Sequence, residues 1–406
     1  MKKKVAIIGG GTAGLFLAAF LKTDIYDVTI FEKNTSLGRK FLVAGDGGFN
    51  LTNSEELSSF KSRYTPSSFL DNALNHFSNA DLRTWLLSLG IPTFVGSSGK
   101  VFPEKGIKPI KVLKCIEAYL INKNVKFEFN KTFTNWDEEN SLEFNSKEII
   151  KSDYTVFALG GSSWKITGSD GSWLNVFNKK GIDTLPFRPS NCAYRIKWHE
   201  KFIQNNEGKP LKNISISLKN KIQKGEAVIT KFGIEGNAIY GLSPEIQSIL
   251  ASKNEVVVYA DFKPAYNLSN LTEKITRSNS NITITLRKKI KLSSVVIELI
   301  KGTLTKEEFI DIQTLAKFIK IFPLTIVDSA PIDEAISTSG GINLNAIDYD
   351  FEIKKIKNHF CIGEMLDWDA PTGGYLIQAC ASMGVYLAHQ LNNNHPDHLN
   401  LYTFEE

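Results

Sequence analysis

The stretch that decides the fold is VAIIGGGTAG, residues 5–14. Val5–Ile8 form a continuous apolar run, which is typical of a strand buried on both faces of a parallel sheet. Glycines then follow at the GxGxxG spacing. Gly9 permits a tight turn, Gly11 lets the backbone approach a pyrophosphate, and Gly14 lets the following helix pack closely on the strand. The pattern predicts a strand, a glycine-rich turn and a helix that together bind a dinucleotide.

The residues around this turn support the same interpretation. The backbone N–H groups at the helix start, which include Thr12 and Ala13, together with the helix dipole, attract a diphosphate. Residues 27–31 are predicted to form a second strand, and Glu32 follows at its end. An acid at this position of a Rossmann unit accepts hydrogen bonds from a ribose. A tight turn with no ligand explains the glycines less completely, because strand, glycines, helix, second strand and acid all agree.

The segment that follows indicates a longer cofactor than NAD. Residues 33–54 are rich in glycine and polar side chains, where a plain NAD-binding domain continues into a compact helix and strand. Small residues allow the backbone to run close to a ligand, although a flexible surface loop is the alternative. The candidate contacts here are Lys33, Gly38, Arg39, Lys40, Gly45, Gly47, Gly48, Asn50, Thr52 and Asn53.

Two later stretches narrow the cofactor to a flavin. Residues 153–164 form a strand that ends in glycines, and residues 359–391 contain a strand, an acidic loop, a Gly-Gly turn and a long helix. An acid after a glycine suits a polyol chain, and the positive end of the last helix can face the electron-rich edge of a reduced flavin. The alternative is that the two glycines only form a turn before a buried helix and do not approach a flavin. The candidate contacts are Ala158, Leu159, Gly160, Gly363, Glu364, Gly373, Gly374, Tyr375 and Leu376.

These motifs make the chain resemble, over nearly its whole length, the BaiN-like family of FAD-containing, NAD(P)-linked oxidoreductases, in particular its two-domain flavoprotein subgroup. The matching stretches include LGRKFLVAGDGGFNLTNS (37–54), SSGKVFPEKGIK (97–108), FALGGSSWKITGSDGSW (157–173), PSNCAY (189–194), GEAVITKFGIEGNAIY (225–240), PIDEAISTSGG (331–341) and GEMLDWDAPTGGYL (363–376). Much of the wider family has Arg-Cys before the Asn of its N-[FL]-T-N segment, where this chain has Gly48-Phe49. No catalytic role is therefore carried over from that pair.

The resemblance implies an α/β fold: a Rossmann-type FAD-binding domain of the glutathione-reductase type, divided by an inserted antiparallel β domain, barrel-like, and a small helical insertion. The sequence pattern agrees, because short β-type runs alternate in the middle of the chain and a helical pattern follows them. We expect the FAD-binding domain at 1–186 and 333–406, the β domain at 187–262 with a return strand at 321–332, and the helical insertion at 263–320.

The resemblance also implies the chemistry. It indicates non-covalently bound FAD and hydride transfer to or from a small organic substrate, with an activated C=C bond as one acceptor. Since no second GxGxxG is present, NAD(P)H would dock transiently or an electron-donor protein would replace it. Lys231, Glu235 and Tyr240 are the candidates for the substrate-side proton donor, with surface residues on a barrel turn as the equal alternative. An FAD-dependent hydroxylase and a flavin-dependent RNA-modifying protein remain as other functions.

Composition excludes several classes. The formal charge of the 406-residue chain is +5. We interpret its lysines as scattered along the sequence, so a nucleic-acid partner is not expected. The four cysteines have no CxxC spacing, which disfavours disulfide chemistry and indicates a reducing, cytoplasmic compartment. The histidines show no metal-binding spacing, and no apolar run is long enough to predict a membrane helix.

Overall fold

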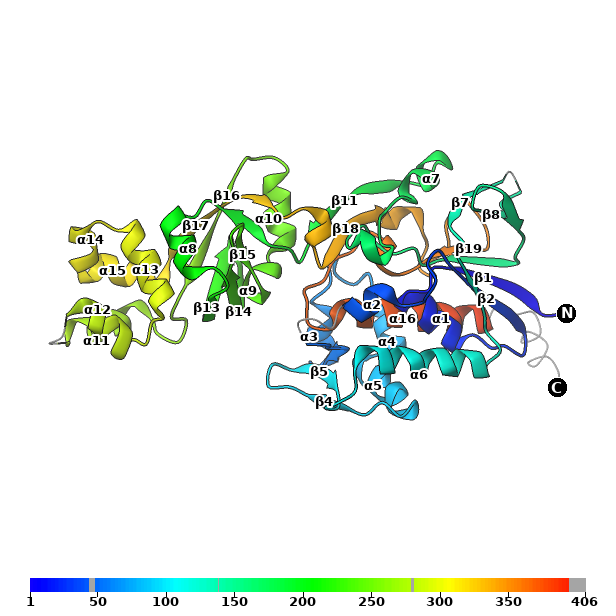
Figure 1. Ribbon diagram of the computed structural model, residues 1–406, viewed down its shortest axis with the longest axis horizontal. Coiled ribbons are helices and arrows are strands. Elements are labelled where there is room, and N and C mark those ends of the chain that lie inside the picture. The colour runs from blue at the N-terminus through cyan, green and yellow to red at the C-terminus, as the bar shows by residue number, and fades with distance from the viewer. Residues whose placement is uncertain (44–47, 138, 279–280, 394–406) are drawn as a thin grey trace, which may run out of the picture. The chain divides into compact units, whose positions relative to one another are not determined.

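The computed structural model describes residues 1–43, 48–137, 139–278 and 281–393. The chain divides into two compact units, which are described separately (Figure 1). Unit 1 comprises residues 1–188 and 337–406, and unit 2 comprises residues 189–336. The division into five segments expected from the sequence stays a prediction. No helix among the described residues is long and apolar enough to cross a membrane.

A five-stranded parallel sheet forms the centre of unit 1. Its strand order is β19-β10-β1-β2-β6, and all four neighbouring pairs are parallel. The apolar run at residues 5–8 lies in the central strand, where every one of its side chains is buried. The strands are β1 (Lys3–Ile8), β2 (Tyr26–Glu32), β6 (Lys126–Phe129), β10 (Tyr154–Phe157) and β19 (His359–Cys361). This is the Rossmann arrangement that the sequence predicts.

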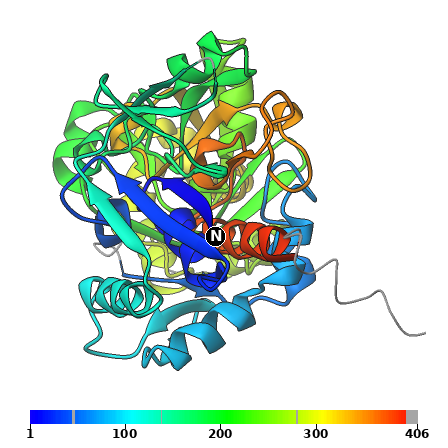
Figure 2. The same cartoon turned by 90° about the vertical axis from the view of Figure 1, so that its right-hand side faces the viewer.

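Two helices from opposite ends of the chain pack together beside this sheet. Helix α1 (Thr12–Phe20) lies against α16 (Tyr375–Asn393), as Figures 1 and 2 show. A Cβ atom at Gly384 would lie 2.6 Å from the carbonyl oxygen of Ala13 and 2.7 Å from the amide nitrogen of Leu17. The absence of a side chain at Gly384 therefore permits the close approach of the two helices. This packing brings the C-terminal part of the chain next to the first glycine-rich turn.

The remaining elements of unit 1 surround the sheet. Three smaller sheets have the strand orders β3-β5-β4, β7-β8-β9 and β11-β18. Their strands are β3 (Thr52–Asn53), β4 (Thr93–Val95), β5 (Lys100–Pro103), β7 (Phe133–Trp136), β8 (Leu142–Phe144), β9 (Glu148–Ile150), β11 (Thr184–Ser190) and β18 (Ser337–Ile342). The α-helices are α2 (Arg39–Val43), α3 (Leu57–Lys61), α4 (Asp71–His76), α5 (Asn79–Ser88), α6 (Pro109–Asn122) and α7 (Leu174–Lys179). Short 3-10 helices, labelled η, are η1 (Lys165–Thr167), η3 (Leu344–Ala346) and η4 (Gly363–Met365).

Unit 2 is built on a closed six-stranded barrel, so the barrel-like β domain expected from the sequence is confirmed. Its order is β12-β15-β14-β13-β16-β17, with every described pair antiparallel. The strands are β12 (Tyr194–Ile196), β13 (Pro210–Leu218), β14 (Lys221–Ile229), β15 (Gly233–Glu235), β16 (Val256–Asp261) and β17 (Phe322–Ser329). Apolar side chains that alternate along these strands fill the interior.

Unit 2 contains two groups of helices in addition to the barrel. Three short ones, α8 (Glu200–Asn206), α9 (Asn237–Tyr240) and α10 (Ser243–Leu250), lie between barrel strands where the sequence pattern predicts only β structure. They are too short to show a helical period, so their capping residues are the only local signal. The helical segment between β16 and β17 contains α11 (Leu268–Thr276), α12 (Ile282–Lys288), α13 (Ser294–Thr303), α14 (Lys306–Ile310) and α15 (Ile312–Lys320), and η2 (Ile332–Glu334) follows β17.

Candidate functional site

The first backbone N–H groups of α1 have no hydrogen-bond partner within the helix. Gly11 occupies the N-cap position, and no side chain caps the helix. A Cβ atom at Gly11 would meet no other atom within 4 Å. A Cβ atom at Gly9 would instead lie 2.3 Å from the carbonyl oxygen of Ala158, and one at Gly14 would lie 2.2 Å from that of Gly9. Protein packing thus requires Gly9 and Gly14, whereas the space at Gly11 fits a diphosphate bound at a helix N-terminus.

The carboxylate of Glu32 is held beside this helix start. Its Oε2 atom accepts a hydrogen bond from the backbone N–H of Gly10 at 2.9 Å. Its Oε1 atom accepts from the backbone N–H of Asn34 at 2.9 Å and from the side-chain amide of Asn34 at 2.8 Å. An ionised carboxylate offers about four acceptor positions. The three protein donors therefore fix the carboxylate and leave acceptor capacity for a ribose hydroxyl.

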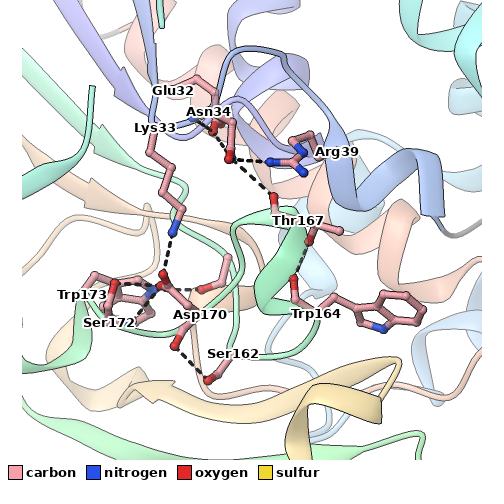
Figure 3. Close-up of polar contacts among 11 residues, drawn as sticks. Glu32, Lys33, Asn34, Arg39, Ser162, Trp164, Thr167, Asp170, Ser172 and Trp173 are labelled. Carbon is pink, nitrogen blue, oxygen red and sulfur yellow. Dashed lines mark hydrogen bonds and ion pairs between the residues drawn. The ribbon is translucent and has the colours of Figure 1, made fainter. Parts of the chain in front are cut away.

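Lys33 and Arg39 contact protein groups in the loop region beside Glu32 (Figure 3). The ammonium of Lys33 lies 2.9 Å from Oδ2 of Asp170, and Arg39 donates to the side-chain oxygen of Asn34 at 2.7 Å. Although burial raises the pKa of Asp170, hydrogen bonds from Ser172 and the nearby Lys33 hold it below its ordinary value. The ion pair between Lys33 and Asp170 holds the segment around residue 170 close to the end of β2. A direct contact of Lys33 or Arg39 with a cofactor stays a prediction.

Lys40 and Glu364 form an ion pair at the centre of a second polar cluster. The Nζ atom of Lys40 lies 2.8 Å from Oε2 of Glu364 and donates to the hydroxyl of Ser163 at 2.8 Å. The backbone N–H of Thr338 donates to Oε1 of Glu364 at 3.1 Å. A Cβ atom at Gly363 would lie 3.0 Å from Cβ of Ala13, in the first turn of α1. Glu364 is therefore fixed close to the helix start, as a group that binds a cofactor hydroxyl must be.

The first turn of α16 has structural roles that the sequence does not reveal. A Cβ atom at Gly374, where φ is +96°, would lie 2.4 Å from Cα of Thr52 in β3. The hydroxyl of Tyr375 donates to Glu55 at 2.9 Å, while its carbonyl oxygen accepts from Tyr64 at 2.8 Å. Burial, and then Glu55, raise the pKa of Tyr375. The hydroxyl and the carbonyl oxygen of Tyr375 thus both have protein partners, and its contact with a cofactor stays a prediction.

Lys100 is a nearby residue that was not among the expected contacts. It pairs with Asn53 between β5 and β3, and its Cε atom lies 3.7 Å from the Cβ position of Gly373. Its position in the stretch SSGKVFPEKGIK is the sequence signal that points to it. Lys100 therefore places a positive charge beside the start of α16. Asn34, Ser163 and Asp170 were likewise missed. Ser163 and Asp170 contact residues more than 100 positions away, whereas Asn34 contacts Glu32 two positions away, a local contact that the sequence pattern does not indicate.

The other expected cofactor contacts lie in different local environments. Gly38 donates its backbone N–H to Gly10 at 2.9 Å, and its Cα faces the side chain of Leu113. The carbonyl oxygen of Gly160 accepts from the indole of Trp173 at 3.1 Å. Gly45 and Gly47 lie outside the described residues. Gly48 is exposed, Asn50, Leu159 and Leu376 are half-buried, and Thr52, Asn53 and Ala158 are buried.

Two cysteines of unit 1, Cys361 and Cys380, have raised pKa values. All four cysteines of the chain are free. Burial, followed by the charge of Glu364, raises the pKa of Cys380 to about 12, and burial raises that of Cys361 well above its ordinary value. Since the thiolate is the reactive form, neither residue is suited to thiol–disulfide exchange.

The three candidates for a proton donor belong to unit 2. Lys231 is exposed, with its ammonium 5.1 Å from the ring centre of Phe232. Glu235 is half-buried at the end of β15, and burial raises its pKa. Burial, and then the charge of Glu235, raise the pKa of Tyr240 in α9. Glu235 and Tyr240 therefore retain their protons more strongly than exposed residues do, whereas Lys231 is a surface residue.

The fold and the site define the class of protein. A Rossmann sheet with an open, uncapped helix start beside a fixed acid, joined to a barrel unit, is the architecture of an FAD-dependent oxidoreductase. The sequence profile of the HI0933-like protein Rossmann domain matches residues 3–390. The chain belongs to this family, and the BaiN-like resemblance is confirmed.

The chain is similar to enzymes that carry two different names. The 3-dehydro-bile acid delta(4,6)-reductase of Clostridium scindens is 25% identical over 410 residues, which cover 95% of this chain and 98% of that protein. The ribosomal RNA dihydrouridine synthase of Haemophilus influenzae is 26% identical over 393 residues, which cover 92% and 94%. A flavocytochrome c3 fumarate reductase structure aligns with a TM-score of 0.50 at 12% identity, over 97% of this chain and 78% of that one. This last likeness concerns the fold alone.

Proposed function

We propose that the protein is a flavin-dependent reductase that adds hydrogen across a C=C bond conjugated to a carbonyl group. The open helix start at Gly11 beside the fixed carboxylate of Glu32 carries the flavin assignment. The names of the two kinds of relative support the reaction. One name describes reduction of a delta(4,6) system next to a 3-oxo group, and the other describes saturation of the uracil ring. Both are additions of hydride and a proton to an activated C=C bond.

In this proposal each part of the site binds a different part of FAD. The N–H groups at the start of α1 bind the diphosphate, and Glu32 accepts hydrogen bonds from a ribose. Glu364, held by Lys40, accepts from a hydroxyl of the polyol chain. The start of α16, with Gly373, lies towards the ring. Bound FAD supplies hydride transfer, while the chain supplies binding, orientation and charge.

The reduction also needs a proton and a source of electrons. We propose Tyr240 or Glu235 as the proton donor. Burial raises the pKa of both groups, so each stays protonated to a higher pH than an exposed residue of its kind. NAD(P)H is the proposed electron donor. It would bind transiently, and an electron-donor protein is the alternative.

Anaerobic titration of the FAD-loaded protein tests the proposal. Loss of the oxidised flavin absorbance on addition of NADH or NADPH would support NAD(P)H as donor, and reduction only by a protein donor would replace it. Reoxidation of the reduced protein by a conjugated enone, with the saturated ketone as product, would support the reaction. A hydroxylated product formed with stoichiometric consumption of oxygen would contradict it and identify a hydroxylase.

A uracil base in RNA is a second candidate acceptor, which one observation favours. The helical segment at 263–320 contains eleven Lys or Arg against five Asp or Glu, whereas the whole chain contains 48 against 43. The rest of the chain is therefore close to neutral, and the positive charge is concentrated rather than scattered. Such concentration is the electrostatic signature of a nucleic-acid partner, so the expectation of no such partner is not confirmed.

A further inference from the structure

The positive charge of the helical segment is concentrated further within it. Residues 274–297 contain six Lys or Arg and no Asp or Glu. Four of the basic residues lie within five positions at the end of α12 and just beyond it, and all four are exposed. We call them the basic face: Arg287, Lys288, Lys289 and Lys291. None of them forms an ion pair within the described part of the chain.

The acids of the helical segment are used elsewhere. Glu273 pairs with Arg277 at 2.6 Å, and Glu298 accepts from the side chain of Asn206 at 3.0 Å. Glu308 accepts the backbone N–H of Thr305 at the start of α14, and Asp311 caps the start of α15. Glu307 lies in the first turn of α14, where the helix dipole favours an acid. Among the described residues, no acid of the helical segment therefore forms an ion pair with the basic face.

Helix stability explains only part of the basic face. Arg287 and Lys288 lie in the last turn of α12, where a cation interacts favourably with the helix dipole. Lys291 lies beyond the helix, with a φ of +56°. Its carbonyl oxygen accepts the ammonium of Lys263 at 2.9 Å, so a fifth cation is held next to it. Like charges gathered in this way repel each other, and an anionic partner would remove that repulsion.

We propose that the basic face docks the phosphate backbone of RNA. A group of exposed cations without ion-pair partners attracts a polyanion, and each phosphate that is bound releases counterions. A helix that lies in the surface of an anionic membrane also presents a face of apolar side chains. Ile284 is the only large exposed apolar residue in the described part of 274–297. The inference rests on the second candidate acceptor, but RNA binding is measured without flavin reduction, so the two can fail separately.

The test compares two fourfold variants of the full-length, FAD-loaded protein. In the first, Arg287, Lys288, Lys289 and Lys291 are all replaced by Gln. In the matched control, four exposed lysines of unit 1 are replaced by Gln: Lys105, Lys108, Lys111 and Lys114. Fluorescence anisotropy measures binding of a fluorescein-labelled RNA hairpin with uridines in its loop, at several salt concentrations. Circular dichroism and flavin absorbance establish that both variants are folded and loaded.

We expect the basic-face variant to bind RNA at least ~10-fold more weakly and with a shallower salt dependence, by about 0.7 in slope for each phosphate that is no longer neutralised. The control should bind like the unchanged protein. Equal affinity of the basic-face variant and the unchanged protein would overturn the proposal, and so would a larger decrease in affinity in the control. Binding of phosphatidylglycerol vesicles that depends on the basic face, without RNA binding, would assign the face to a membrane surface instead. A single replacement of Lys291 by Gln keeps the test valid if the fourfold variant does not fold.

Discussion

The ammonium of Lys40 lies 2.8 Å from the carboxylate of Glu364, although 324 positions separate the two residues in the chain. The pair joins the short helix α2, near the start of the chain, to the 3-10 helix η4, near its end. Its side chains are 29% and 15% exposed, so solvent weakens the attraction without abolishing it. The proposed cofactor site is thereby built from the two ends of unit 1.

A double-mutant cycle on this pair should measure its contribution. We expect Lys40→Met and Glu364→Gln each to lower the free energy of unfolding, with a coupling of about 1 kcal/mol between them. The apparent Kd for FAD should rise in both single variants, and Lys40→Arg should retain part of the affinity. Lys114→Met on the exposed surface of α6 is the control. Additive effects of the two replacements would show that the ion pair does not position Glu364.

Replacement of Glu32 should weaken FAD binding. Glu32→Ala removes a charged acceptor from the ribose and from the N–H of Gly10, which corresponds to about 1.5–3 kcal/mol. Glu32→Gln should cost less, because its amide oxygen can still accept one of these hydrogen bonds. Calorimetric titration of FAD into the apoprotein measures the difference. Glu128→Gln, at an exposed position of the neighbouring strand β6, should leave the affinity unchanged. Unchanged affinity of Glu32→Ala would refute the ribose assignment.

The sequence predicted the features of the fold that depend on local pattern. The apolar run before Gly9 and the GxGxxG spacing predicted β1 and α1, because burial on both faces of a strand and close helix packing each require particular residue types. The alternation of short β runs predicted the barrel. The three short helices between barrel strands were missed because a helix of four to eight residues shows no clear period.

The details of the site were less predictable. Glu364 was expected as a polar contact, but its pairing with Lys40 follows from tertiary packing that no local pattern contains. The approach of Gly374 to a flavin stays a prediction, and the structure adds a reason for the glycine that no local pattern contains: a Cβ atom there would lie 2.4 Å from Cα of Thr52. The concentration of charge in residues 274–297 was present in the sequence throughout. It became informative only when the structure showed which acids of the helical segment already have partners.

The stability of the protein should depend on the ionisation of Glu235. Burial raises the pKa of Glu235 in the folded protein above its value in the unfolded chain. Between these two pKa values the folded state binds more protons, so stability is lost as pH rises through the folded pKa. Glu235→Gln should therefore be stabilised relative to the unchanged protein at neutral pH, and the difference should shrink as the solution is acidified below the unfolded pKa. Urea unfolding across this range measures it, with Glu226→Gln on the exposed face of β14 as control. A difference that does not vary with pH would contradict the assignment.

The two glycines before α16 should respond differently to a methyl group. Both have positive φ, +126° at Gly373 and +96° at Gly374, so alanine at either position costs about 1–2 kcal/mol in backbone strain. At Gly374 the new Cβ would also lie 2.4 Å from Cα of Thr52, whereas at Gly373 its nearest neighbour is the ring of Tyr375 at 3.2 Å. We expect Gly374→Ala to be destabilised by about 1–3 kcal/mol more than Gly373→Ala in denaturant unfolding of the apoprotein. Equal destabilisation would show that the approach to Thr52 is not tight.

Lys100 should raise the reduction potential of bound FAD. Its aliphatic chain passes 3.7 Å from the Cβ position of Gly373, so its charge lies near the positive end of α16. Reduction adds negative charge to the flavin, which a nearby cation stabilises. Lys100→Met should lower the potential by about 1 kcal/mol, or about 20 mV for a two-electron couple, and Lys100→Arg should restore most of it. Titration against reference dyes gives the potential, and Lys105→Met, an exposed lysine in the same segment, serves as control. An unchanged potential in fully loaded Lys100→Met would place the flavin ring away from the start of α16.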